Sequence, residues 1–286
     1  FNKKNRFAPL GLIPILAPEL NLHGFGMKSI RTAVKSLGHG RRKAKRKGYS
    51  NRPQNRLLRR EFANEGILMS RESLYSMMFS NEVWVNRGVN APNYATVLVS
   101  GDSHAVQIDR YHAECTAQNQ DRLPSWIFHG AIYDGRKALG TFWEKNWGTA
   151  NSGRYDQHIL PQVEAYLREE RANGRNPIFQ HDNAPAHKSE EIRVDLQRRQ
   201  ILTLRWPPYS PDLNLIGYVW SWMKRFIQPH HSMVNYDPSR IPLQELRWIV
   251  QQAWLAVPDD FITNLYESWW DCCAAVILAD GGPTRY

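Results

Sequence analysis

The chain has 286 residues, of which 42% are hydrophobic and 12% aromatic, enough to bury one sizeable core beside a smaller module. Its formal net charge is +10 at pH 7. No apolar run approaches the roughly 20 residues that span a bilayer, and no signal-peptide pattern opens the chain, which argues against a membrane protein. Its three cysteines lack disulfide-framework or zinc spacing, which favours a reducing compartment. Because the first residue is Phe1, we expect a fragment or a processed product.

The positive charge is concentrated at the N-terminal end. Residues 1–60 contain 16 Lys and Arg and a single acid, Glu19, whereas residues 61–286 contain 21 basic and 26 acidic side chains. A cationic arm joined to a mildly acidic globule is typical of a module that binds nucleic acid. A solvated, disordered tail is the alternative interpretation.

Residues 1–40 predict the end of a helix-turn-helix unit. Two apolar stripes at helical spacing flank the turn "HGFG", and Gly38 ends the second stripe. They comprise Ile13, Leu16 and Leu20, and then Met27, Ile30, Val34 and Leu37. The second helix would present Lys28, Arg31 and Lys35 to a DNA groove and its phosphates. Any small helical hairpin shares this pattern.

Residues 41–68 are interpreted as a basic arm and linker. A run as charged as "GRRKAKRKGYSNRPQNRLLRR" cannot enter a core, and we expect it to follow phosphates or lie in a minor groove. It also fits a nuclear-import signal, so we expect a nuclear protein. The expected DNA contacts in this run are Arg41, Arg42, Lys43, Lys45, Arg46 and Lys47.

Residues 69–230 predict an α/β domain, and residues 231–286 a helical extension. Strands come first and then alternate with helices, which indicates a mixed sheet flanked by helices. We expect a strand at 74–88, a hairpin turning at Asp134-Gly135, a helix at 154–174, a strand at 177–182, a helix at 187–200, a strand at 201–206 and a helix at 214–227. Residues 88–125 are interpreted as a long insertion with one or two strands, and 243–277 as one or two helices.

Asp182 is the first candidate for chemistry. In "PIFQHDNAPAH" it follows a short apolar strand, and an acid at the carboxyl end of a strand projects from the sheet edge, where metals and phosphates collect. Asp182 could equally cap a helix that begins near Ala186.

Several ordered motifs resemble a known family. "FSNEVWV", "IFHGAIYDGRKAL", "YDQHILPQVEAYL", "FQHDNAPAHKS" and "WPPYSPDLNLIGYVWSWMK" together resemble the catalytic domain of Tc/mariner-type transposases, which belong to the DDE superfamily of endonucleases and have an RNase H-like fold. The resemblance covers roughly residues 13–230. It implies Mg²⁺- or Mn²⁺-dependent cleavage and strand transfer of double-stranded DNA at transposon terminal repeats, and it is compatible with a homodimer.

The resemblance also identifies what is missing. The family holds two metal ions, about 4 Å apart, with two aspartates and a glutamate. Asp182 matches the second position, but Asn81 occupies the first and Gly217, 35 positions after Asp182, the third. A glycine inside a helix costs about 0.5–1 kcal/mol relative to alanine, so Gly217 is out of place on local grounds too. Asn81 keeps an oxygen without charge and Gly217 keeps no ligand, so we expect weak metal binding and no DNA cleavage.

Substitute ligands are not evident in the sequence. Glu82 should point to the opposite face of the strand from Asn81, and Asp212 is interpreted as part of the helix start in "SPDL". His181 and His187 flank Asp182, but packing or loop hydrogen bonding is the expected role.

Two further groups are assigned to the core. The tryptophans of the C-terminal tail resemble a base-stacking platform, but core or dimer contacts are expected instead. They are Trp248, Trp254, Trp269 and Trp270. Cys272 and Cys273 are expected to be buried.

Three functional hypotheses follow. The first is a Tc/mariner-like transposase, or a protein derived from one, that binds transposon DNA with degraded metal ligands. The second is a non-catalytic DNA-binding or assembly protein that uses the old catalytic domain as a scaffold. The third is an active nuclease with unrecognised ligands. The enzymatic hypotheses require tight binding of two divalent ions, whereas the scaffold does not.

Overall fold

The computed structural model describes residues 19, 21–22, 24–43, 52–86, 94–98, 125–183, 189–231 and 241–284. These residues belong to two compact units, one within residues 1–47 and 91–123 and the other within residues 48–90 and 124–286. None of the described helices combines the length and the apolar character that crossing a bilayer requires.

In the part of the smaller unit that the structure describes, there is an α-helix and a two-stranded ribbon. Helix α2 (Met27–Ser36) buries Ile30 and Val34 of the second apolar stripe against Leu22, whereas Met27 and Leu37 of that stripe are exposed. Strand β1 (His39–Lys43) pairs antiparallel with β3 (Tyr94–Leu98), so the first basic residues of the expected arm are held in a strand. The first expected helix, around Ile13 and Leu16, lies outside the described residues.

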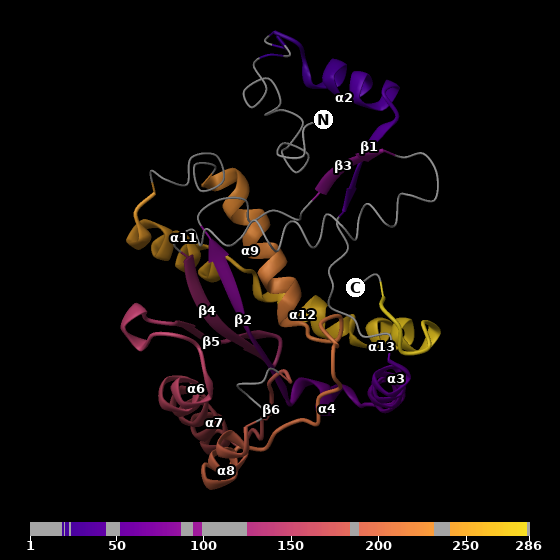
Figure 1. The fold of residues 1–286 in the computed structure, drawn as a ribbon. Helices are drawn as coiled ribbons and strands as arrows, with labels where there is room; N and C mark the ends of the chain where they lie inside the picture. The colour runs from indigo at the N-terminus through magenta and orange to yellow at the C-terminus, as the bar shows by residue number, and fades with distance from the viewer. Residues whose placement is uncertain are drawn as a thin grey trace. The chain divides into compact units, whose positions relative to one another are not determined.

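The larger unit is built on a mixed sheet, as predicted. Within the described residues it has four strands in the order β5-β4-β2-β6, shown in Figure 1. Strands β2 (Met77–Asn86), β4 (Ser125–Tyr133) and β5 (Arg136–Phe142) form antiparallel pairs, β2 with β4 and β4 with β5, while β6 (Ile178–Gln180) runs parallel to β2.

The β4–β5 hairpin follows its turn residues. Asp134 and Gly135 both have positive φ, 53° and 71°, which is the backbone geometry that a two-residue turn of this hand requires. The predicted strand at 201–206 is wrong, because only a single bridge forms, between Phe179 and Thr203. Two backbone hydrogen bonds make this bridge: the N–H of Phe179 donates to the carbonyl oxygen of Leu202 at 2.8 Å, and the N–H of Leu204 donates to the carbonyl oxygen of Phe179 at 2.9 Å.

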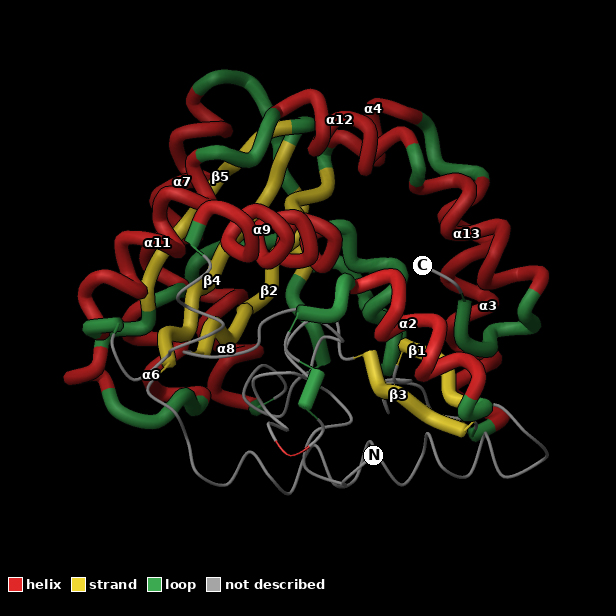
Figure 2. Tube along the Cα trace, turned by 90° about the horizontal axis from the view of Figure 1, so that it is seen from above, coloured by secondary structure: helices red, strands yellow, loops and turns green. Residues whose placement is uncertain are grey.

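Helices cover both faces of the sheet. They are α3 (Pro53–Ile67), α4 (Arg71–Tyr75), α6 (Ser152–His158), α7 (Leu160–Ala172), α8 (Glu190–Arg198), α9 (Ile216–His230), α11 (Leu243–Leu255), α12 (Asp259–Glu267) and α13 (Trp269–Leu278), with the short 3₁₀ helix η3 (Lys145–Trp147). On one face, α6, α7 and α8 enclose a core with Met78 and Phe179. On the other, α9, α11, α12 and α13 enclose a larger core with Phe79 and Val83. Figure 2 shows α9 lying across β2 and β4.

Two expected helices are divided. The predicted helix at 154–174 breaks between α6 and α7 at Ile159, two residues before Pro161. The tail forms three helices rather than one or two, because Pro258 precedes α12 and Ser268 separates α12 from α13.

Helix α3 packs into the larger unit, although the sequence assigned its residues to the arm and linker. It lies against α13, where the Nε1 atom of Trp269 donates to the carbonyl oxygen of Gly66 at 3.0 Å. A Cβ atom on Gly66 would lie 2.8 Å from the Sγ atom of Cys273, so only glycine permits this close approach. The larger unit therefore includes residues before position 69.

Most of the predicted tail core is confirmed. Trp254 and Trp269 are buried, as are both cysteines, and the Nε1 atom of Trp270 donates to the carbonyl oxygen of Met69. Trp248 is the exception, since 52% of its surface is exposed.

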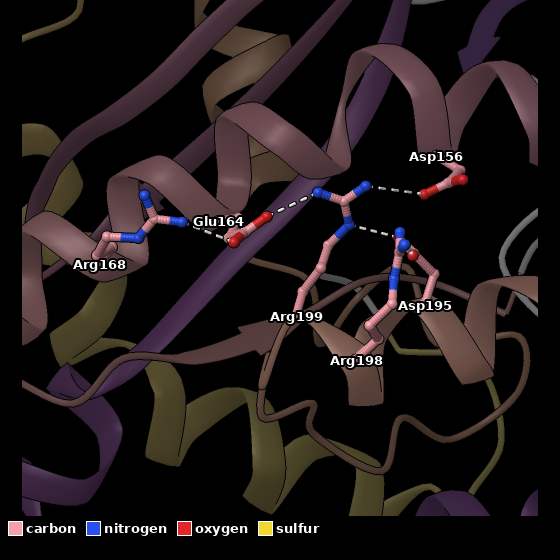
Figure 3. Close-up of polar contacts among 6 residues, drawn as sticks. All are labelled: Asp156, Glu164, Arg168, Asp195, Arg198 and Arg199. Carbon is pink, nitrogen blue, oxygen red and sulfur yellow. Dashed lines mark hydrogen bonds and ion pairs between the residues drawn. The ribbon is translucent and has the colours of Figure 1, made fainter.

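A charged network ties α6, α7 and α8 together, as Figure 3 shows. Arg199 contacts Glu164 at 2.6 Å and Asp156 at 3.4 Å, and also Asp195. Burial raises the pKa of Asp195, but hydrogen bonds with Asp156 and with the neighbouring arginines outweigh burial and lower the pKa to about 2. Asp195 therefore stays ionised over the physiological range and helps to hold these three helices together.

Candidate active site

Asn81 lies in the middle of β2, on the face that α9 covers. Residues of a strand alternate between faces. Phe79 and Val83, two positions before and after Asn81, pack in the α9 core, whereas Met78 packs in the opposite core. The side-chain oxygen of Asn81 accepts a hydrogen bond from the backbone N–H of Glu82 at 2.9 Å.

Asp182 follows the strand that neighbours Asn81. Strand β6 pairs in parallel with β2, and Phe79 stands opposite Gln180. Asn81 comes two residues after Phe79, and Asp182 comes two residues after Gln180. The register therefore leads both positions to the same sheet edge. The expectation that these two positions come from adjacent strands is confirmed. Asp182 is half-buried and lies in the loop just beyond β6.

Gly217 is the second residue of α9, which begins at Ile216, two residues later than predicted. The N–H of Gly217 donates to the carbonyl oxygen of Asn214 at 3.0 Å, and the side chain of Asn214 donates to the carbonyl oxygen of Ser80 at 3.1 Å. Ser80 immediately precedes Asn81. Hydrogen bonds thus link β2 to the start of α9, and Gly217 lies on the helix beside the strands, as expected.

A close approach of helix and sheet supports this arrangement. Gly130 on β4 stands opposite Asn81, and a Cβ atom on Gly130 would lie only 2.4 Å from the ring of Trp220. Trp220 is three residues after Gly217, about one helical turn. The absence of a side chain at Gly130 therefore lets α9 lie directly over the strand pair that carries Asn81.

Glu82 does not replace the missing first carboxylate. It alternates with Asn81 and so faces the opposite core, the side of the sheet that holds Tyr155. Burial raises the pKa of Tyr155 well above its ordinary value, and the carboxylates of Glu82 and Asp182 raise it further. The Tyr155 phenol is therefore neutral at physiological pH and offers no anionic ligand.

Asp212 forms an ion pair with Arg59, and its expected role at the helix start is wrong. Its two carboxylate oxygens each accept a hydrogen bond of 2.8 Å from the guanidinium of Arg59, and one also accepts from Thr284. Helix α9 begins four residues later, with Leu215 at its N-cap position. No local pattern in the sequence indicates this ion pair, because the partners are 153 positions apart.

The structure describes one of the two histidines that flank Asp182. His181 stacks on Phe179, with ring centroids 5.7 Å apart, which agrees with the packing role expected for it. His187 lies outside the described residues.

The predicted DNA contacts are only partly described. Lys28, Arg31 and Lys35 are exposed on α2, and the structure places Arg41, Arg42 and Lys43 in β1. The remaining three predicted contacts, Lys45, Arg46 and Lys47, lie outside the described residues.

The residues present do not fit a pair of divalent ions. Of the three expected ligand positions, only Asp182 carries a carboxylate. Within the described ranges, no three His, Cys, Asp or Glu side chains are grouped so that they could hold a metal ion. Hard divalent cations need several charged oxygen ligands, and this site supplies one.

The sequence did not single out three polar residues that surround these positions: Ser80, Gln180 and Asn214. All three are at most 4% exposed. The available signal was a polar residue inside an apolar run, as in "DLNLI" and "IFQHD", because a buried polar side chain needs a specific partner.

Comparisons with known proteins agree with this geometry. A family model described as "DDE superfamily endonuclease" matches residues 125–237. The Tcb2 transposase of Caenorhabditis briggsae is 25% identical over 276 residues, which cover 91% of this chain and 88% of that protein. The Tc1 transposase of Caenorhabditis elegans is 37% identical over 113 residues, which cover 40% of this chain and 38% of that protein.

Solved structures show the same fold. The catalytic domain of the Mos1 mariner transposase superposes with a TM-score of 0.56 at 15% identity, covering 83% of this chain and 98% of that chain. A structure described as a pre-cleavage Mos1 transpososome gives a TM-score of 0.60 at 15% identity, covering 95% of this chain and 75% of that chain. The motifs, the mixed RNase H-like sheet and these matches together support a Tc/mariner-type transposase of the DDE superfamily.

Proposed function

We propose that this protein binds the duplex DNA of transposon ends and does not cleave it. The smaller unit, which includes the basic run at 41–47, supplies the cationic surface, and the larger unit supplies the transposase fold. The basic run also supports a nuclear location, since it fits an import signal. The description of a Mos1 structure as a transpososome supports assembly of this chain on DNA, with a second copy at the other transposon end.

One observation supports the proposed loss of cleavage. Strand β2 carries Asn81, the neighbouring β6 leads to Asp182, and a hydrogen bond from Asn214 links β2 to the start of the helix with Gly217, yet only Asp182 has a charged oxygen. At about 4 Å from a divalent ion, each missing carboxylate forfeits several kcal/mol even at an effective dielectric constant near 20. A site with one carboxylate cannot hold two ions against that deficit. An assembly protein that uses this domain as a scaffold would show the same geometry.

The test compares binding with nicking on the same DNA. A duplex with the terminal repeats of the parent element should be bound in EDTA, and adding Mg²⁺ or Mn²⁺ should produce no nicked strand on a denaturing gel. Asp182→Ala should leave binding unchanged. Metal-dependent nicking by the unmodified chain, abolished by Asp182→Ala, would overturn the proposal in favour of unrecognised ligands.

DNA affinity should depend on the basic run. We expect replacing its six cations at positions 41–43 and 45–47 by Gln to reduce the slope of log affinity against log salt concentration. The slope should fall by about 0.9 for each phosphate that is no longer neutralised, or by up to about 5 in total. Affinity is measured by fluorescence anisotropy at several salt concentrations. A matched control replaces six exposed arginines of the larger unit: Arg154, Arg168, Arg193, Arg198, Arg205 and Arg225. An equal reduction of this slope in both variants would show that the basic run has no special role in DNA binding.

A further inference from the structure

Helix α3 carries three arginines that have different surroundings. The guanidinium of Arg59 is paired with Asp212, and its side chain is 1% exposed. Arg56 and Arg60 stand four residues apart, which places them on one face of the helix. Their side chains are 38% and 45% exposed, so this face meets solvent. The positive charge of the N-terminal end therefore continues onto α3 through two of its three arginines.

One carboxylate, that of Asp280, lies between the two exposed arginines. The Nη2 atom of Arg56 donates to its Oδ2 atom at 2.9 Å, and the Nη1 atom of Arg60 donates to its Oδ1 atom at 2.7 Å. Each carboxylate oxygen thus accepts from a different guanidinium. Arginine donates in the same way to the oxygens of phosphate groups, so the carboxylate stands where a phosphate would bind. We call Arg56 and Arg60 the arginine fork.

The arginine fork lines a hollow in the protein surface. This hollow has a volume of about 240 Å³ and is open to solvent. It is lined by Pro53, Arg56, Leu57, Arg60 and Asp280. Its ionisable groups are two arginines and one carboxylate, so it keeps a net charge of +1 even with the carboxylate in the fork. The hollow therefore attracts a further anion from outside.

Part of the arginine fork is held without the Asp280 carboxylate. The Nε atom of Arg56 donates to the backbone carbonyl oxygen of Asp280 at 3.0 Å. The chain also packs closely here, because a Cβ atom on Gly281 would lie only 2.0 Å from the carbonyl oxygen of Arg56. Helices α3 and α13 lie side by side in both views (Figures 1 and 2). Removing the carboxylate charge should therefore leave Arg56 in place.

A phosphate could replace the Asp280 carboxylate at little cost. The side chain of Asp280 is 63% exposed, and ion pairs between exposed side chains contribute little to stability because water screens them. A duplex on the basic run would also be near, since Arg56 follows Lys47 by nine residues, which span at most about 30 Å. The backbone of bound DNA can thus compete with Asp280 for the fork.

We propose that the arginine fork is a binding site for a backbone phosphate of duplex DNA, and that Asp280 occupies it until DNA displaces the carboxylate. This inference rests on the proposed function, because the duplex is the one that the basic run binds. It goes further in assigning a DNA contact to the larger unit and a competing anion to the C-terminal segment. Asp280 therefore lowers the affinity of the chain for DNA.

The first experiment measures the affinity of the full chain for the terminal-repeat duplex by fluorescence anisotropy. Asp280→Asn should tighten binding by about 3–10-fold, because two exposed ion pairs no longer compete with the phosphate. Asparagine tolerates the positive φ of 48° at this position as aspartate does. The matched control is Asp271→Asn, an exposed position of α13 that lies nine residues, or about 13 Å of helix, before Asp280. The control should change affinity much less.

The gain in affinity should depend on the arginines. Arg60→Gln removes one exposed arm of the fork, and on that background Asp280→Asn should tighten binding less than it does in the unmodified chain. With Arg56→Gln added, the gain should disappear. On the Asp280→Asn background, the two arginine replacements together should reduce the slope of log affinity against log salt concentration by about 0.9, the value for one phosphate. Thermal unfolding checks that each variant is folded.

A second experiment needs no DNA and compares inorganic phosphate with chloride at equal ionic strength. Phosphate should raise the unfolding temperature of Asp280→Asn more than that of Asp271→Asn, because an anion bound in the fork stabilises the folded chain. Adding Arg56→Gln and Arg60→Gln should remove this difference.

The outcomes distinguish this inference from the proposed function. If the unmodified chain binds the duplex, equal gains in Asp280→Asn and Asp271→Asn overturn the inference and leave the proposed function standing. A gain that persists without both arginines does the same. If no variant binds the duplex, the proposed function fails and the phosphate comparison decides: extra stabilisation of Asp280→Asn supports a phosphate site at the fork, and equal stabilisation overturns it.

Discussion

Restoring both missing carboxylates should give a protein that cleaves DNA with Mg²⁺ or Mn²⁺, whereas we expect no cleavage by the unmodified chain. The double change Asn81→Asp and Gly217→Glu supplies the two ligands of the family arrangement that this chain lacks. Space permits both: a Cβ atom on Gly217 would meet only the carbonyl oxygen of Pro211, at 3.8 Å, an ordinary contact. Asp at position 81 keeps the oxygen that accepts from the N–H of Glu82. A glutamate in the first turn of α9 should also favour the helix dipole, by about 0.3–1 kcal/mol.

Neither single change should suffice. Asn81→Asp alone leaves one ion without the glutamate, and Gly217→Glu alone leaves the other without its aspartate, so the two effects should be strongly non-additive. Nicking of a duplex with the terminal repeats, quantified on denaturing gels with and without Mn²⁺, measures this. Adding Asp182→Ala to the double variant is the control and should abolish the activity. A folded, DNA-binding double variant without activity would place further decay elsewhere in the chain.

The sequence predicted those parts of the site that depend on local signals. The turn residues Asp134-Gly135 determine the β4–β5 hairpin because few other residues adopt positive φ at both positions. Strand alternation placed Glu82 on the other face, whereas the assignment of Asp182 and Gly217 as ligand positions rests on the family resemblance.

What the sequence did not predict depends on partners far along the chain. Asn214 was assigned to the helix itself, although its side chain bonds Ser80, 134 positions away. Helix α3 was placed in a basic arm because its residues are charged, yet Arg59 is 1% exposed. Local periodicity describes which face of an element is apolar, and it carries no information on which buried charge meets which. The strand expected at 201–206 is reduced to one bridge, between Phe179 and Thr203, which its composition did not indicate.

Arg59→Met should destabilise the larger unit by about 3–5 kcal/mol, because it leaves Asp212 buried and uncompensated. Besides its two bonds to Asp212, the guanidinium donates to the carbonyl oxygens of Tyr209 at 2.8 Å, Gly281 at 2.9 Å and Gly282 at 3.1 Å. It thereby joins α3, the loop before α9 and the C-terminal segment. A loss of this size is a large part of the roughly 5–15 kcal/mol by which domains are stable.

Matched variants separate the buried ion pair from the general effect of removing a charge. Arg60→Met removes only an exposed contact to Asp280 and should cost about 0–1 kcal/mol in urea denaturation. Combining Arg59→Met with Asp212→Leu should recover part of the loss, since no buried charge is then left alone, although the three carbonyl contacts stay broken. A loss below about 1 kcal/mol for Arg59→Met would mean that solvent reaches Asp212 readily. Because Asp212 lies five residues before Gly217, the loop would then rely on the Asn214–Ser80 contact to hold the start of α9 against β2.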